Sequence, residues 1–394
     1  MNFPVHNGQN LDNTLKRKKS YKNEWNGPTE VVKTICQLSD MLLERFNFEP
    51  MEVSKMKVVI TDFEFGDLKY EEKVLNHSDV ELVYGQCKTE EEVIEFCRDA
   101  DGIINQYAPI SRRVIESLEN CKIIARYGVG VDTIDIEAAT EKGIPVGYVP
   151  DYGIDEVSDH ALALIMNVLR KVTITNKSVK NGVWDYAVTK PIRRLRTLTI
   201  GLVGFGNIPR RLSQKVQALG MNVIVSDPFI SEEVVKDNKA TLVSLNELCE
   251  QADVISVHAP LTNSTKGMLG KDQFNLMKDG VYIVNTARGP VIDESALIDA
   301  IQTGKVSGAG LDVLDKEPIS SGHPFLTLDQ VTLTPHMAGY SEEAYAELRS
   351  KTALALMDVL VYSQTPKYLF NKNVSEQLSL KPFTEDSHYK NLGY

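Results

Sequence analysis

The fold is decided by residues 199–211, Thr-Ile-Gly-Leu-Val-Gly-Phe-Gly-Asn-Ile-Pro-Arg-Arg. An apolar strand here runs directly into Gly204-x-Gly206, and a helical pattern follows as far as Gly220. In such a unit the first glycine permits a tight turn, and the second lets the backbone approach a pyrophosphate held at the helix N-terminus. The stretch therefore predicts a βαβ unit that binds a dinucleotide.

Asp227 strengthens this prediction, because it ends the next predicted strand, Val-Ile-Val-Ser-Asp. A carboxylate at that place accepts hydrogen bonds from the ribose hydroxyls and repels a 2′-phosphate, so NAD is favoured over NADP. Pro209 stands where the third glycine of the fingerprint is expected, and the helix should survive because Pro is tolerated in a first helical turn. Arg210 and Arg211 belong to that helix and are not counted as a phosphate clamp.

Short apolar strands alternate with helical stretches on both sides of this unit. Such alternation predicts parallel sheets covered by helices on both faces. The expected fold is α/β, with two Rossmann- or flavodoxin-like doubly wound parallel-sheet domains. The predicted strands are 57–62, 81–84, 102–105, 122–126 and 145–149 in a first series, and 198–203, 223–226, 254–258, 281–285, 308–313 and 331–333 in a second.

Composition sets the broad class of the protein. The chain has 394 residues, is 42% hydrophobic and 25% charged, and carries a net charge of −11. These values are ordinary for a globular protein, and the acidic balance argues against nucleic acid or an anionic membrane as a partner. We find no apolar run long enough to span a bilayer and no secretory signal, and the five cysteines are dispersed and odd in number. We therefore expect a cytoplasmic protein with reduced thiols and no metal site.

Three ionisable residues stand at or just beyond strand ends of the second series: Arg288, Glu317 and His336. Open α/β sheets bind their ligands at that edge. Arg288 would pair with a substrate carboxylate through its planar fork. His336 would give a proton to a carbonyl oxygen and take it back in the reverse reaction, while Glu317 would orient the imidazole and favour its protonated form.

Each of these residues has a plainer interpretation when taken alone. Arg288 could form a surface ion pair, Glu317 could be a solvated loop acid, and His336 could cap a helix. Their joint placement favours the catalytic interpretation. His258 is expected to line the cofactor crevice, whereas His160, on the predicted helix 156–171, is expected to be a hydrogen-bonded core or interface histidine.

The first 55 residues form an extension with one predicted amphipathic helix that begins near Pro28. Its apolar residues recur at three- and four-residue spacing, which describes one helix face. That face would pack on the host domain or across a subunit interface, and the alternative is a dedicated partner-binding helix. The apolar residues are Val31, Val32, Ile35, Leu38, Met41, Leu42 and Phe46.

In their order along the chain, these motifs resemble the D-isomer-specific 2-hydroxyacid dehydrogenase family. The resemblance covers about residues 56–372, and two stretches, residues 149–160 and 340–344, are most similar to bacterial relatives of the C-terminal-binding-protein branch. Besides residues 199–211, the motifs are Ala125-Arg-Tyr-Gly-Val-Gly-Val-Asp, Val257-His-Ala-Pro-Leu-Thr, Asn285-Thr-Ala-Arg-Gly, Gly310-Leu-Asp-Val-Leu-Asp-Lys-Glu-Pro and Thr334-Pro-His.

The resemblance implies that an NAD domain, residues 132–335, is inserted into a substrate domain built from residues 56–131 and 336–372. An extension, residues 1–55, precedes them and a tail, residues 373–394, follows. It also implies a homodimer built largely on the NAD domains, and an active-site cleft at the hinge.

The resemblance further implies roles for individual residues. Arg288, Glu317 and His336 would be catalytic, and Asp312 would touch the nicotinamide carboxamide. The expected substrate-binding residues are Arg126, Val129, Gly130 and Arg288. The expected cofactor-binding residues are Gly204, Gly206, Asn207, Ile208, Asp227, His258, Pro260, Thr265, Thr286, Ala287, Arg288, Asp312, His336 and Gly339.

Besides Pro209, two departures from the family pattern bear on the substrate. Gly339 stands where the C-terminal-binding proteins carry a tryptophan, which predicts a wider pocket there. Residues 105–108, Asn-Gln-Tyr-Ala, lack the Arg-Ser pair often seen at the matching loop, which argues against a substrate of the 3-phosphoglycerate type.

The sequence thus predicts an NAD-dependent oxidoreductase that interconverts an (R)-2-hydroxy acid and a 2-oxo acid. An alternative from another class is an NAD(H)-sensing, corepressor-like binding module whose interaction element is the N-terminal helix. A third is a dehydrogenase of formate or a phosphorus oxyacid, although an Arg-Glu-His set suits a carbonyl better.

Overall fold

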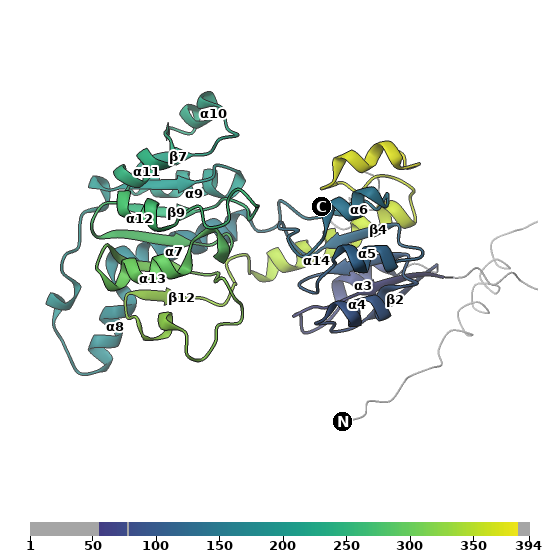
Figure 1. Cartoon of the computed structure of the whole chain (residues 1–394), viewed down its shortest axis with the longest axis horizontal. Helices are drawn as coiled ribbons and strands as arrows, with labels where there is room; N and C mark the ends of the chain where they lie inside the picture. Colours follow the sequence, from purple (N-terminus) through teal and green to yellow (C-terminus); the bar gives the residue numbers. More distant parts are fainter. Residues whose placement is uncertain (1–54, 77–78, 385–394) are drawn as a thin grey trace, which may run out of the picture. The chain divides into compact units, whose positions relative to one another are not determined.

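The computed structural model describes residues 55–76 and 79–384, all of which belong to the unit Lys55–Tyr394 (Figure 1). The predicted N-terminal helix and the last ten residues lie outside this description. Among the described residues, every helix falls short of the length and apolar character that crossing a bilayer requires.

The first sheet has five parallel strands in the order β2-β1-β3-β4-β5. Every residue of β3 and β4 is buried, as expected for central strands that are covered on both faces. The strands are β1 (Met56–Ile60), β2 (Val80–Tyr84), β3 (Gly102–Asn105), β4 (Ile123–Arg126) and β5 (Val146–Gly147).

Two apolar cores cover the two faces of this sheet. Helices α4 (Glu90–Cys97), α5 (Arg112–Ser117) and α6 (Ile136–Glu141) contribute to one core. Helices α3 (Lys69–Leu75) and α14 (Glu342–Leu360) contribute to the other. Polar side chains stop the short helices from extending toward their N-termini: Thr89, for example, caps α4 in a capping box with Glu92.

The chain leaves the first sheet later than the predicted boundary at residue 131. Residues 146–147 pair with β4, and α6 packs in the core of the same sheet. The change of sheet therefore falls between β5 and the next helix, α7 (Ile154–Arg170). A two-residue strand carries little local pattern, which is why its partner sheet is hard to assign from sequence. The predicted tail also begins inside the packed structure, since Val374 is buried in η5 (Lys372–Gln377).

The second sheet has seven parallel strands in the order β12-β11-β10-β9-β6-β7-β8. From β6, the next strands along the chain, β7 and β8, are added on one side of the sheet. The later strands, β9 to β12, are added on the other side, so the strand order reverses between β6 and β9. The strands are β6 (Thr199–Val203), β7 (Asn222–Ser226), β8 (Thr241–Leu242), β9 (Val254–Val257), β10 (Val281–Asn285), β11 (Val306–Leu311) and β12 (Val331–Leu333). Open α/β sheets form their ligand crevice at the carboxyl ends of the strands at such a reversal.

Helices cover both faces of the second sheet. Helices α7 and α9 (Asn207–Ala218) pack in one core, and α11 (Leu245–Gln251), α12 (Lys271–Leu276) and α13 (Glu294–Gln302) pack in the other. The prediction of two doubly wound parallel-sheet domains is confirmed. The remaining elements are α8 (Val172–Lys180), α10 (Glu232–Asp237), η1 (Tyr186–Thr189), η2 (Leu195–Thr197), η3 (Gly289–Val291) and η4 (Pro324–Thr327).

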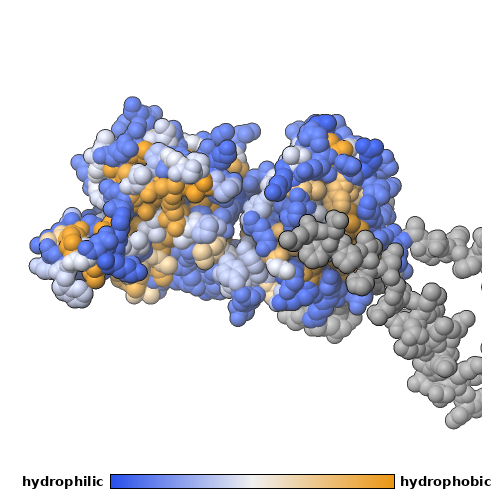
Figure 2. Space-filling model, turned by 90° about the horizontal axis from the view of Figure 1, so that it is seen from below, coloured by the Kyte–Doolittle hydropathy of each residue, from blue (hydrophilic) through white to orange (hydrophobic). Residues whose placement is uncertain are grey.

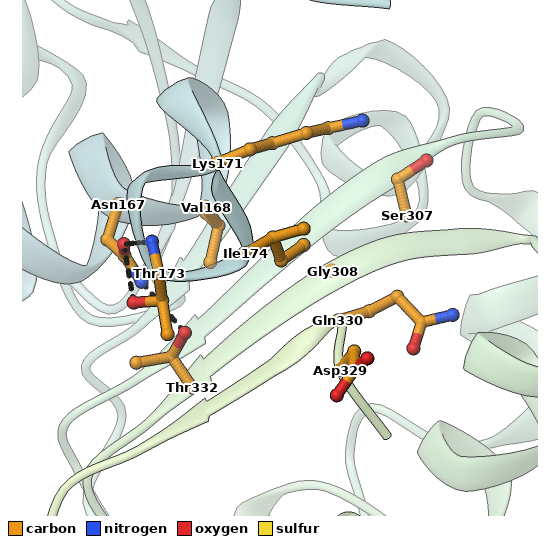
Figure 3. Close-up of a pocket in the computed structure, with 10 residues that line it drawn as sticks. All are labelled: Asn167, Val168, Lys171, Thr173, Ile174, Ser307, Gly308, Asp329, Gln330 and Thr332. Atoms are coloured by element: carbon orange, nitrogen blue, oxygen red, sulfur yellow. Dashed lines mark hydrogen bonds between the residues drawn. The ribbon is translucent and has the colours of Figure 1, made fainter. Parts of the chain in front are cut away.

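A small hollow lies where α7 passes into α8, beside β11 and β12 (Figure 3). Asn167 holds this junction: its amide nitrogen donates to Thr332 Oγ1 over 2.7 Å, and its oxygen accepts from the backbone and hydroxyl of Thr173. Because these polar groups satisfy one another, the hollow has the character of a helix junction rather than of a ligand site.

Candidate active site

The glycine turn at the end of β6 is shaped by the neighbouring end of β9. Gly204 has φ +92°, and a Cβ added there would lie 3.1 Å from the backbone carbonyl of His258. Gly206 is the residue before α9, and nothing lies within 4 Å of the Cβ it lacks. The turn thus needs glycine at its first position and leaves open space at its second, beside the free amides of a twelve-residue helix.

The start of α9 agrees with the predictions for this region. Asn207 and Ile208 form its first turn together with Pro209, which is buried, so the helix does survive the replaced glycine. Arg210 donates to the Phe205 carbonyl over 2.9 Å, and Arg211 forms an ion pair with Asp155 at 2.7 Å. Both arginines are therefore engaged by the protein itself.

Asp227 lies beside the same turn. One carboxylate oxygen accepts from the Phe205 amide over 2.8 Å, and the other accepts from the Phe229 amide over 2.9 Å. These bonds fix the carboxylate at the end of β7 and leave lone pairs on both oxygens for a diol. A carboxylate at the end of this strand can accept hydrogen bonds from ribose hydroxyls.

Three of the predicted cofactor residues follow β9. The His258 ring accepts from or donates to Ser256 Oγ over 2.9 Å, and burial lowers the pKa of His258 to about 3. The ring is therefore neutral at physiological pH. The carbonyl of Pro260 accepts from Thr265 Oγ1 over 2.6 Å, which closes the loop after the strand.

Asn285 positions the loop that carries Arg288. It is buried at the end of β10, accepts from the Ala287 amide and donates to the Arg288 carbonyl, both over 2.9 Å. Gly289 packs so closely that a Cβ there would lie 1.9 Å from the carbonyl carbon of Leu314. The buried Thr286 Oγ1 has no hydrogen-bond partner among the described residues. An orphaned hydroxyl at the carboxyl edge of the sheet that carries the glycine turn fits a site that a dinucleotide completes.

Asp312 is the anchor of the turn that carries His336. It is 2% exposed, and its oxygens accept from Thr334 Oγ1 over 2.5 Å and from the amides of Met337 and Ala338. Burial alone would raise the pKa of Asp312, but these hydrogen bonds and one from His160 lower it, so it stays an anion. His160 also contacts Thr334 Oγ1 at 2.9 Å, so it is a hydrogen-bonded histidine as predicted.

His336 itself adopts φ +50°, the left-handed region that residues with a side chain rarely occupy. The Asp312 carbonyl accepts from its amide over 2.8 Å, which helps to hold this conformation. Asp312 therefore supports the His336 turn through both its backbone and its carboxylate, a connection that the sequence pattern alone does not reveal.

Glu317 pairs with His336, with 2.7 Å between Oε2 and Nδ1. Its other oxygen accepts from the Leu314 amide over 2.9 Å. Burial works to raise the pKa of Glu317, but the hydrogen bond and charge of His336 hold it below its ordinary value. An anionic Glu317 accepts from Nδ1–H, which leaves Nε2 of His336 as the nitrogen free to exchange a proton with a ligand.

Two guanidinium groups lie against a glycine loop after β4. A Cβ added at Gly128 would lie 1.8 Å from Arg126 Nη1, and one at Gly130 would lie 2.0 Å from Arg288 Nη2. Among the described residues, the amides of Val129 and Gly130 donate to no protein acceptor. The loop therefore combines free N–H groups with two arginines.

Arg126 is buried without a carboxylate partner. It donates to the Tyr127 carbonyl, while its Nε has no partner among the described residues. Burial and the nearby Arg288 both lower the pKa of Arg126. Within residues 55–76 and 79–384, Arg288 has one contact with a carboxylate, 3.2 Å from Nε to Asp132 Oδ1. Two incompletely neutralised guanidinium groups at one place form a receptor for an anion such as a carboxylate.

Tyr107 connects the arginine pair to His336. Its ring centroid lies 6.0 Å from the Arg126 guanidinium and 6.3 Å from the His336 ring. The buried Asp62 holds its backbone, accepting from the Tyr107 amide over 2.6 Å and from the Gln106 amide over 3.2 Å. The loop 105–108, which the sequence marks only by a missing Arg-Ser pair, thus contributes an aromatic wall.

A tyrosine lies beside Gly339, at the place where the sequence predicts a wider pocket. A Cβ added there would lie 3.0 Å from the hydroxyl of Tyr152, whose phenol ring takes the neighbouring space. No sequence pattern indicates this contact, because the two residues are far apart along the chain.

The fold and these groups define a class of protein: an α/β oxidoreductase that binds a dinucleotide at the strand-order reversal. Residues 162–338 match the family described as D-isomer specific 2-hydroxyacid dehydrogenase, NAD binding domain. The chain is also 35% identical over 307 residues to a hydroxypyruvate reductase from Blautia hydrogenotrophica. This match covers 74% of this chain and 93% of that protein. The chain therefore belongs to the D-isomer-specific 2-hydroxyacid dehydrogenase family, with NAD as its cofactor.

Other relatives carry different names. The D-3-phosphoglycerate dehydrogenase of Archaeoglobus fulgidus is 41% identical over 269 residues, but the match spans 68% of this chain and only 51% of that protein. A crystal structure of D-lactate dehydrogenase from Aquifex aeolicus, complexed with NAD and lactic acid, is similar with a TM-score of 0.72 and 29% identity, over 83% of this chain and all of that one.

Proposed function

We propose that the protein interconverts an (R)-2-hydroxy acid and the corresponding 2-oxo acid, with His336 as general acid and base. The observation that carries this proposal is the convergence of the His336–Glu317 pair with Arg126 and Arg288. A proton donor beside a receptor for a carboxylate suits a 2-oxo acid, whose carbonyl is bonded directly to its carboxylate.

The substrate carboxylate would bind to the amides of Val129 and Gly130 and to the guanidinium of Arg288. Arg126 would add a second positive charge in a buried place, where charge interactions are strong. When bound, NADH supplies a hydride to C2 of the 2-oxo acid, and NAD accepts the C2 hydride of the 2-hydroxy acid in the reverse direction.

His336 Nε2 would give its proton to the carbonyl oxygen in reduction and take it back from the hydroxyl in oxidation. The imidazole becomes positively charged when it holds both protons, and the anionic Glu317 stabilises that charge through Nδ1. The Asp312-supported turn keeps the ring in place, so that little reorganisation is needed during the proton transfer.

The homodimer and the cytoplasmic location predicted from the sequence belong to the same proposal. Support for a dimer comes from the segment 172–188, since α8 has no buried residue and Trp184 is 88% exposed. Figure 2 shows that apolar side chains interrupt the hydrophilic surface on the face it displays. The exposed apolar residues of this segment are Val172, Val179, Val183, Trp184, Tyr186 and Val188.

The test is an assay of the full chain with NADH and a panel of 2-oxo acids, alongside a direct measurement of NADH binding by fluorescence. We expect NADH binding together with turnover of at least one short 2-oxo acid. Tight NADH binding without oxidation by any member of a broad panel would contradict the proposal and favour a nucleotide-sensing role.

A further inference from the structure

Tyr152 lies at the edge of the candidate active site, on the segment between β5 and α7. The amide of Val149 donates to the Gly128 carbonyl over 3.0 Å, so this segment runs beside the glycine loop of the two arginines. The next residue, Gly153, is close to Gly339: a Cβ at position 153 would lie 3.6 Å from the Gly339 backbone. Tyr152 is therefore enclosed between the glycine loop and the turn that carries His336.

The Tyr152 ring is held by packing, while its hydroxyl is free. The ring packs on the core formed by the first sheet and α14. Among the described residues, the hydroxyl has no hydrogen-bond partner, although the side chain is largely shielded from solvent. Because the described residues offer the hydroxyl no protein partner and do not bury it completely, it is accessible to water or to a ligand that completes its hydrogen bonds.

The Tyr152 phenol lies within electrostatic range of two guanidinium groups and of Glu156. Burial raises the pKa of Tyr152, while the charges of Arg126 and Arg288 act in the opposite direction, so the phenol stays protonated and close to both cations. The Tyr152 hydroxyl also lies near the position that a Gly339 side chain would take, and Gly339 is three residues after His336. The hydroxyl can thus donate and accept where the anion receptor and the proton donor meet.

We propose that Tyr152 determines substrate specificity by hydrogen-bonding a polar group on C3 of a short 2-oxo acid. This inference rests on the proposed function. If the carboxylate takes the loop amides and Arg288, and the carbonyl oxygen takes His336, the third substituent of C2 remains to be bound. The Tyr152 hydroxyl offers that substituent a polar partner, and the phenol beside Gly339 leaves little room for a branched or aromatic side chain.

The test compares three acids that differ only beyond C2. Glyoxylate has no C3, pyruvate has a methyl group there, and hydroxypyruvate has a hydroxymethyl group. We expect Tyr152→Phe to lower kcat/KM for hydroxypyruvate about tenfold, and to change the values for pyruvate and glyoxylate less than threefold. NADH affinity and thermal stability should stay at the wild-type values.

Tyr148→Phe is the matched control, because it removes the same atom four residues earlier from a ring that packs on Phe370. It should leave all three kcat/KM values unchanged. An equal loss with all three acids in Tyr152→Phe would place the hydroxyl on the common carboxylate and overturn the inference, as would no change with any of them. If the wild-type protein reduces none of the three acids nor any longer 2-oxo acid, the proposed function itself fails.

Gly339→Ala is a second variant that does not depend on the fold tolerating a changed tyrosine. Its Cβ would lie 3.0 Å from the Tyr152 hydroxyl and displace it. We expect the same selective loss with hydroxypyruvate. A gain with hydroxypyruvate in this variant would contradict the assignment of Tyr152.

Discussion

The loop 204–206 after β6 and the loop 128–130 after β4 both follow the carboxyl end of a parallel strand, yet they make room for different groups. At Gly204 the missing side chain admits the backbone of the neighbouring strand end, and Gly206 faces open space. At Gly128 and Gly130 the missing side chains admit the guanidinium groups of Arg126 and Arg288. The first loop is thus an uncharged opening beside a helix N-terminus, and the second is a positively charged receptor.

The difference follows from what comes next in the chain. A twelve-residue helix begins directly after the first loop, so its amides can bind phosphate without any side chain. No helix begins after the second loop until α6, at Ile136, so charge has to come from side chains. A strand end followed by glycines therefore does not by itself identify the ligand.

The largest effect is expected at His336, which would exchange the proton with the substrate and belongs to neither loop. His336→Ala should lower turnover by about 10²-fold or more, with NADH binding retained, because a general acid is lost. His323→Ala is the control, since His323 makes a similar pair with Glu294 at 2.8 Å outside the site. Unchanged turnover in His336→Ala would exclude His336 from the mechanism.

Gly130→Ala should affect the charged loop alone. The new Cβ would lie 2.0 Å from Arg288 Nη2, the end of a flexible side chain that can move. We expect kcat/KM for the 2-oxo acid to fall between about tenfold and a hundredfold through misplacement of the guanidinium, with little loss of stability. NADH affinity, measured by fluorescence titration, should not change. A loss of NADH affinity as large as the loss of kcat/KM would show that the two loops are not independent.

Gly204→Ala should affect the uncharged loop. Here the new Cβ meets backbone atoms of His258 that cannot move aside, and φ is +92°. We expect NADH to bind about tenfold more weakly, and the free energy of unfolding to fall by about 1–2 kcal/mol. Gly322→Ala is the control, because its Cβ would meet nothing within 4 Å. Wild-type NADH affinity in Gly204→Ala would mean that this turn does not hold the cofactor.

Asp227→Ala should change which dinucleotide the uncharged loop accepts. Without the carboxylate, repulsion of a 2′-phosphate disappears, so the ratio of NAD to NADP affinity should fall several-fold. Both cofactors should be titrated against the same preparation. An unaltered ratio would mean that the ribose is held elsewhere.

The smallest effect at neutral pH is expected from His258, whose backbone borders Gly204. Because burial lowers the pKa of His258 to about 3, the unfolded chain binds its proton more readily between about pH 6.5 and pH 3. Folding stability should therefore decrease as the pH falls through this window. In His258→Asn the decrease should be shallower by at most about 1.4 kcal/mol per pH unit, as measured by denaturant unfolding. Parallel pH profiles would contradict the lowered pKa.

Sequence reasoning was strongest where a motif and its function lie within one βαβ unit. Gly204, Gly206 and Asp227 are close along the chain, and the Phe205 amide between the two glycines donates to Asp227 over 2.8 Å. The pairing of Glu317 with His336 was also anticipated, since both follow strands that are neighbours in the sheet. The signal in each case is a polar residue at the end of an apolar strand. The same signal marks Asn285, Asp312 and Arg126, but their partners do not follow from it.

Contacts between segments that are distant along the chain could not be predicted from the sequence. The packing of Tyr152 beside Gly339 joins segments that the second sheet separates along the sequence. The pairing of residues 146–147 with β4 is local, but a strand of two residues carries too little pattern to show its partner. Asp62 is a comparable case, since its carboxylate holds the amides of residues 106 and 107 from a neighbouring strand end. Such residues look like ordinary polar or aromatic positions until the strands are in order.

The sequence by itself determined the elements of this protein, its dinucleotide turn and the residue types that its chemistry needs. These follow from the spacing of apolar residues and glycines, which is a local pattern within single helices, strands and turns. Only the tertiary structure decided that two guanidinium groups pack against one glycine loop, that Asp312 supports the His336 turn, and that the Tyr152 hydroxyl lies beside Gly339. These contacts depend on the order of the strands, which the packing of the whole chain determines and no local pattern contains.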